Sequence, residues 1–157
     1  MSNMSLFEAK EPDLKKERRH TILISTLVVI VLVAGILGFW FRHWPEEHRV
    51  DQMFQAIERN DFEAAYALWT SDPQWKQHPE KYKLYPIGVF ETDFGPGSEW
   101  GQIKKHHVDG SVVPQSRNTD SSGVIVKVTV NDIAATPACL WVEKKTKVIG
   151  FSPIPCR

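Results

Sequence analysis

Two cysteines and a few histidine, tyrosine and aspartate side chains are the residues of this chain that could do chemistry. Cys139 and Cys156 are separated by sixteen residues, and neither lies in a CxxC motif or beside a histidine. That context disfavours metal or redox chemistry. In an oxidising compartment the pair can form a disulfide that contributes about 3 kcal/mol in the chain-entropy model. We expect this disulfide to pin the C-terminus to the preceding strands; two free thiols are the alternative.

Acid–base chemistry would need a carboxylate, imidazole or phenol whose pKa is shifted inside an apolar cavity. The sequence offers Asp93, His106, His107, Tyr66 and Tyr85 for that role. We expect Tyr66 to lie in the core and Asp93 to cap a loop. Only one of the two histidines is expected to point inward. No catalytic residue is therefore predicted.

A metal site is not predicted either. His106 and His107 are neighbours on an expected strand, where adjacent side chains point to opposite faces of the sheet. They cannot chelate one ion together, so adding His78 does not complete a metal site. No cofactor is expected.

Four side chains could line a pocket, namely Tyr66, Trp100, His106 and Trp141. Large aromatic rings around a cavity suit an apolar ligand. The same rings also suit an ordinary core, which is the favoured interpretation.

The run EKKTK at residues 143–147 is expected to be a solvated hairpin tip. A tip that faces a membrane surface or an acidic partner is the alternative.

An uncharged stretch at residues 21–41 sets where these groups lie in the cell. Its twenty-one residues would rise about 31 Å as a helix, the thickness of the hydrocarbon core of a bilayer. Five lysines and arginines precede the stretch, and only Arg42 and Arg49 follow it closely. This bias predicts a cytoplasmic N-terminus. A cleaved signal peptide is the alternative, but its apolar region would be shorter and would end in small residues.

Bulky aromatic residues end the stretch, namely Phe39, Trp40, Phe41 and Trp44. At the headgroup level of a bilayer both the apolar ring and the indole N–H are satisfied, so these residues are expected to form a membrane-interface belt. We predict a basic cytoplasmic tail at residues 1–20 and a transmembrane helix at 21–41 in the cytoplasmic (inner) membrane. An extracytoplasmic domain is predicted at 45–157.

The first part of that domain has helical periodicity. Apolar residues recur at i, i+3, i+4 and i+7 from Val50 and again from Phe62, which predicts two amphipathic helices. Pro45 and Asp61 are start signals for them. Prolines then limit the chain to short helical turns, expected near Trp75 and after Pro79.

From Trp100 onward the apolar period changes towards two, which indicates strands. We expect them at residues 101–108, 122–131, 138–143 and 147–151, with a polar turn at 118–122. Helices followed by three to five antiparallel strands predict an α+β domain with the helices on one face of a curved sheet.

Four segments, FQAIERNDFEAAYALW, FGPGSEWG, VIVKVTVN and LWVEKKTKVIGF, give residues 46–153 a resemblance to a known superfamily. They resemble the nuclear transport factor 2-like, or cystatin-like, α+β cone proteins. Tetratricopeptide helices share the opening pattern, but here one hairpin is followed by strands. The resemblance implies that enzyme members, such as those like ketosteroid isomerase, hold a carboxylate, a histidine or a tyrosine inside the cone. No such motif transfers to this chain residue by residue.

The charge balance excludes one class of partner. The chain has 19 basic and 19 acidic residues, and no basic surplus points to nucleic acid.

We expect a membrane-anchored interaction or assembly module, an accessory subunit or scaffold of a membrane complex. Its partners would be membrane lipid and other membrane or extracytoplasmic proteins. The alternative is a small-molecule-binding cone, either a sensor or a divergent cyclase-like or isomerase-like enzyme, which would require an open interior.

Overall fold

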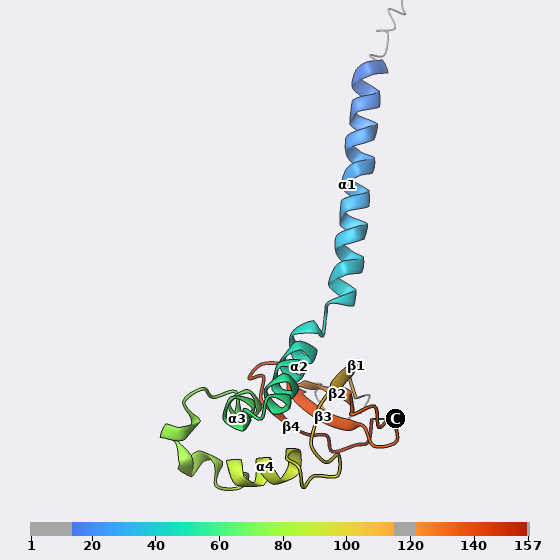
Figure 1. Cartoon of the computed structure of the whole chain (residues 1–157). Helices are drawn as coiled ribbons and strands as arrows, with labels where there is room; N and C mark the ends of the chain where they lie inside the picture. The colour runs from blue at the N-terminus through green and yellow to red at the C-terminus, as the bar shows by residue number, and fades with distance from the viewer. Residues whose placement is uncertain (1–13, 115–121, 157) are drawn as a thin grey trace, which may run out of the picture. The chain divides into compact units, whose positions relative to one another are not determined.

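The computed structural model describes residues 14–114 and 122–156, with the side chains of all of these except residues 14–17 and 40. The chain divides into two compact units, Met1–Phe41 and Arg42–Arg157. Within the described residues it holds four α-helices, two 3-10 helices and four strands (Figure 1). The prediction of an α+β chain is confirmed.

Helix α1, Leu14–Trp40, makes up most of the first unit. Its stretch Arg18–Phe39, 22 residues, is long and apolar enough to cross a membrane, and every side chain in that stretch is exposed. At about 1.5 Å per residue the stretch is roughly 33 Å long. The helix starts earlier than the predicted span because its basic flank is also built from good helix formers. Residues 1–13 of the predicted tail lie outside the described residues.

The domain opens with a helical hairpin, α2 (Trp44–Glu58) and α3 (Phe62–Thr70). As the periodicity predicts, Val50 and Phe54 on α2 are fully buried. The side chain of Asp61 accepts a hydrogen bond from the backbone N–H three residues later, at 3.0 Å. This is the N-cap that the sequence predicts for the second helix.

Three short helices follow, and the sequence predicts two of them. The turns expected near Trp75 and Pro79 are the 3-10 helices η1 (Trp75–Gln77) and η2 (Pro79–Tyr82). The third, α4 (Ile87–Phe94), was not predicted; it starts directly after Pro86. On its own a helix of this length is marginal. Its buried residues, Phe90 and Phe94, show that packing in the core stabilises it.

The four strands form one antiparallel sheet in the order β1-β2-β3-β4. They are β1 (His106–Val112), β2 (Gly123–Val130), β3 (Ala138–Glu143) and β4 (Ile149–Phe151). The last three agree with the prediction, but the predicted first strand, 101–108, starts and ends earlier than β1. A bulge between Val108 and Gly110 interrupts the alternation of β1, so the second half of this strand has no clear period. Of the predicted turn at 118–122, residues 118–121 lie outside the described residues.

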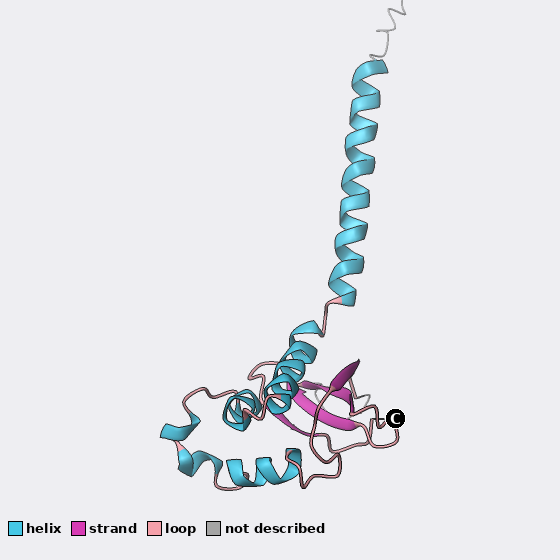
Figure 2. Ribbon diagram, in the orientation of Figure 1, coloured by secondary structure: helices cyan, strands magenta, loops and turns pink. Residues whose placement is uncertain are grey.

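The buried side chains of strand β2 show which face of the sheet packs in the core. Its four valines at positions 124, 126, 128 and 130 are fully buried. Helix α2 packs against β1, β2 and β3, and α3 packs against β4 (Figure 2). The helical hairpin and the valine face therefore share one core, which the aromatic residues of α4 complete.

The opposite face of the sheet carries a different apolar row. The register places Val112, Ile125 and Trp141 side by side across β1, β2 and β3. Val112 is 56% exposed and Ile125 only 1%. Beside them, a Cβ atom on Gly123 would overlap the Trp141 ring and the Val142 carbonyl. Only glycine fits at position 123 while these two strands stay paired.

The last segment of the described chain is fastened to the sheet by a disulfide between Cys139 and Cys156, whose Cα atoms are 5.6 Å apart. After β4 ends, the N–H of Ser152 still donates to the Cys139 carbonyl at 3.0 Å. Pro153 and Pro155 cannot continue the ladder. The chain then turns back, and the N–H of Cys156 approaches Cys139 Sγ at 3.1 Å. This is the cysteine pair expected from the sequence.

Candidate functional site

The four residues predicted as a possible pocket do not gather around one cavity. Tyr66 is fully buried and Trp100 is 8% exposed. The rings of Phe90 and Phe94 lie between them in the core. Tyr66 contacts Phe90, Phe90 contacts Phe94, and Phe94 contacts Trp100.

The other two predicted pocket residues lie elsewhere. The β-sheet register places His106 opposite Val130, on the core face beside α2, and Trp141 opposite Ile125, on the other face of the sheet. A single ligand could not contact both residues from inside the domain.

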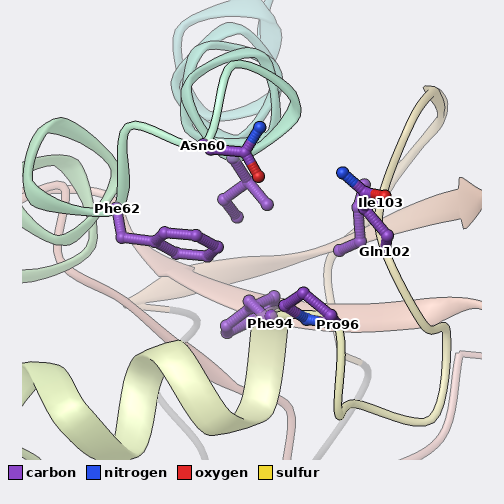
Figure 3. Close-up of a pocket in the computed structure, with 8 residues that line it drawn as sticks. Asn60, Phe62, Phe94, Pro96, Gln102 and Ile103 are labelled. Atoms are coloured by element: carbon purple, nitrogen blue, oxygen red, sulfur yellow. The ribbon is translucent and has the colours of Figure 1, made fainter.

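The depression between the helical hairpin and the end of α4 is filled by side chains. Figure 3 shows Phe62, Phe94 and Ile103 pointing into it, with Asn60 and Gln102 at its rim. It contains no volume that a water molecule could occupy. This part of the interior therefore offers no space for a small molecule.

A more open cleft lies on the surface between α2 and β1. It has a volume of about 180 Å³ and is lined by Trp44, Glu47, His48, Asp51 and Val108. The ring of Trp44 stacks on that of His48 at 4.7 Å. Trp44 belongs to the predicted membrane-interface belt and is 51% exposed, while Phe39 and Phe41 are also exposed. The side chain of Trp40, the remaining member of that belt, lies outside the described residues.

His106 joins this side of α2 to β1. Its Nδ1 lies 2.7 Å from Glu58 Oε1 and its Nε2 lies 3.0 Å from Asp51 Oδ1. A ring nitrogen that carries a proton can donate it to the carboxylate beside it. The imidazole also stacks on Phe54 at 5.2 Å, and its side chain is only 6% exposed. Its neighbour His107 is exposed.

The partners of His106 were missed in the sequence, although a signal was present. Asp51 and Glu58 are seven residues apart on α2, and residues at that spacing lie on the same face of a helix. Together with an inward histidine on a later strand, this pair of carboxylates could have indicated the contact. The contacts of His106 with Asp51 and Glu58 hold β1 against α2, and we call these two contacts the clamp. Both carboxylates therefore already have a partner.

The tyrosines and Asp93 form a second polar group near α4. The Tyr85 hydroxyl donates to Asp93 at 2.7 Å, and the Tyr66 hydroxyl donates to the Tyr85 carbonyl at 2.6 Å. Burial, followed by the bond to Asp93, raises the pKa of Tyr85 well above its usual range. Burial also raises the pKa of Tyr66. Both phenols are therefore held neutral as hydrogen-bond donors, which is the opposite of what a general base requires.

A buried ion pair lies at the start of α2. Glu46 is 4% exposed, and its Oε1 accepts from Lys147 Nζ in the turn between β3 and β4. Among the residues that the structure describes, neither its Oε2 nor the buried Nε of Arg49 has a hydrogen-bond partner. The Arg49 guanidinium otherwise donates to Ser71 Oγ at 3.0 Å. Local sequence patterns do not predict the Glu46–Lys147 ion pair, because its two residues are 101 positions apart.

Within the part of the chain that the structure describes, no group of three or more histidine, cysteine, aspartate or glutamate side chains is arranged to hold a metal ion. His78, considered as a ligand from the sequence, is exposed.

No protein-family model, curated protein or solved structure matches the chain.

Replacing His106 with alanine tests the clamp. We expect the His106→Ala variant to lose about 2–3 kcal/mol of unfolding free energy, since two carboxylates lose their partner and a buried ring is removed. Urea denaturation of the full chain in mild detergent, followed by tryptophan fluorescence, measures this loss. The matched control is His107→Ala, which removes an exposed ring and should cost no more than about 0.5 kcal/mol. Equal losses in the two variants would contradict the clamp.

Proposed function

We propose that this chain is a single-pass protein of the cytoplasmic (inner) membrane, with its N-terminus inside and its folded domain outside. The domain acts as a non-catalytic interaction or assembly module, as an accessory subunit or scaffold of a membrane protein complex. It is a membrane-anchored relative of the nuclear transport factor 2-like cone proteins.

The observation that carries the location is a helix with a long uncharged stretch, followed by a domain with a disulfide. The stretch Arg18–Phe39 of α1 is long and apolar enough to cross a membrane. Five lysines and arginines precede residue 21, and only Arg42 and Arg49 follow the uncharged stretch closely. Such a bias favours a cytoplasmic N-terminus. A Cys139–Cys156 disulfide is stable in an oxidising compartment, which agrees with a domain on the other side of the membrane.

The filled interior supports a binding module over an enzyme. The depression between Phe62 and Ile103 has no room for water, and the phenols of Tyr66 and Tyr85 donate hydrogen bonds within the domain. Catalysis on a small molecule would need an accessible pocket with a group free to exchange protons.

The α2–β1 cleft is the one observation that favours the second candidate, a small-molecule sensor. It has a volume of about 180 Å³ with Asp51 and His48 on its wall. A ligand there should raise the melting temperature of the full chain, and a Trp44→Ala variant should lose that response.

Fusing a reporter after Arg157 tests the location. We expect an enzyme that is active only outside the cytoplasm to be active in this fusion, and a fluorescent protein that matures only inside to stay dark. The chain should also remain in the membrane after extraction at alkaline pH. The reverse pattern of activity would contradict the orientation, and release by alkali would contradict the anchor.

The interaction role is tested by purification in mild detergent from cells that make the tagged chain at low level. We expect a second membrane or extracytoplasmic protein in a fixed ratio to the chain. A chain that runs as a monomer without any second protein, while still folded, would contradict the role as a subunit.

A further inference from the structure

The turn between β3 and β4, residues Lys144 to Lys147, is held beside the first turn of α2. Lys147 makes an ion pair with Glu46, and the carboxylate is almost fully buried. Lys147 has a φ of 59°, a backbone conformation in which glycine is usually preferred. A glycine at position 147 would relieve the backbone strain of the turn but would remove the ion-pair partner of Glu46. The Lys147–Glu46 ion pair therefore holds the turn beside α2.

Chain connectivity sets how far this turn can lie from the end of α1. Glu46 follows Phe41 by five residues, and five residues span at most about 18 Å. Whatever angle the domain adopts, the start of α2 stays within that distance of the end of the apolar helix. If α1 spans a membrane, as proposed above, the β3–β4 turn is attached to the part of the domain that the chain joins directly to the membrane span.

The charges of the turn suit an anionic surface. Lys147 neutralises Glu46, and Lys145 is the lysine of the turn that the charge argument rests on. Lys145 is exposed at the tip, whereas Glu143 is partly buried. Lysines near a bilayer are attracted to anionic headgroups. Arg42, exposed at the start of the same unit, adds a further positive charge near the end of α1.

We propose that the β3–β4 turn binds anionic phospholipid headgroups and so holds the domain down on the membrane surface. This inference rests on the proposed membrane anchor. The anchor keeps the turn at a high effective concentration next to the lipid, so even a weak attraction populates the bound state. An acidic protein would need to be recruited from solution, whereas the lipid surface is always present.

Amine acetylation of the full chain in nanodiscs tests the contact. The chain is reconstituted in discs of zwitterionic phospholipid alone and in discs that contain about one third anionic phospholipid. The rate of acetylation at each lysine is then read by mass spectrometry. We expect Lys145 to react at least threefold more slowly in the anionic discs at low salt. The difference should disappear in about 0.5 M salt, since screening weakens contacts of exposed charges.

Lys104 is the internal control. It is exposed, and its backbone lies two residues before His106, which contacts Glu58 at the other end of α2. Helix α2 has 15 residues, or about 22 Å of rise. Lys104 is therefore well away from the turn, and its rate should be the same in both discs.

Three outcomes would overturn the proposal. Equal rates at Lys145 in the two discs, with the chain integrated, would remove the lipid contact and leave the anchor standing. A chain that fails to enter the discs would remove the anchor and this contact with it. Protection that appears only in native membranes, and not in protein-free anionic discs, would assign the turn to an acidic protein instead.

Discussion

Replacing Trp69 with alanine should lower the free energy of unfolding by about 3–5 kcal/mol, as for a buried aromatic side chain truncated to a cavity. Trp69 is 6% exposed and lies on the buried face of α3. Its ring contacts four others, those of Tyr85, Phe90, Phe94 and Phe151. The indole thus connects α3 to α4 and to the last strand, and none of these rings can close the gap without leaving its own contacts.

Urea denaturation of the full chain in mild detergent measures this effect. Trp44→Ala is the matched control, because it removes the same side chain from a site where the ring is 51% exposed. It should cost about 1 kcal/mol or less. If the Trp69 variant loses less than about 1 kcal/mol, the apolar face of α3 does not pack in the core.

Removing the disulfide should lower the free energy of unfolding by about 3 kcal/mol, the value expected for a loop of this size. Cys139 and Cys156 are 17 positions apart. The bond restricts the unfolded chain, and in the folded domain it places the tail beside β3. The double variant Cys139→Ser with Cys156→Ser is compared with the parent chain in urea, with and without reductant.

The double variant supplies its own control, because its stability should not respond to reductant, whereas that of the parent chain should fall to the same level. Alkylation of the parent chain without denaturant gives an independent result. Two cysteines that react freely under those conditions would contradict the bond and would leave the tail after β4 without a covalent anchor.

The elements predicted correctly from the sequence are those with a strong local period. The spacing from Val50 and Phe62 predicts α2 and α3, and the alternating valines predict β2, because burial of one face determines both patterns. Helix α4 has no such signal. It is eight residues long between proline and glycine, and only its tertiary contacts favour a helix over another turn.

The first strand shows a different limit. Its bulge between Val108 and Gly110 shifts the register, so no single alternation runs through the strand. The prediction extended the strand towards Ile103, which is 3% exposed but lies in the preceding loop. Periodicity alone does not distinguish a buried apolar loop residue from the first residues of the strand that follows it.

The predicted pocket depended on strand pairing, which local patterns do not give. Alternation separates Leu140 from Trp141 on β3, but it does not say which of them faces the helices. The partner of Leu140 is Val126, whose row is covered by α2, so Trp141 lies on the other side. The contacts of His106 and Glu46 join residues 48 and 101 positions apart, a separation that sequence patterns do not connect.

The glycine that opens β2 has a consequence for tracing the ancestry of this chain. A methyl group at position 123 would meet both the indole of Trp141 and the backbone of Val142. A lineage that replaces the indole with a smaller side chain still meets the carbonyl, so the glycine should outlast the tryptophan as sequences diverge. Distant relatives would then be recognised by a glycine at the start of the valine strand, with an aromatic partner only in the nearer ones.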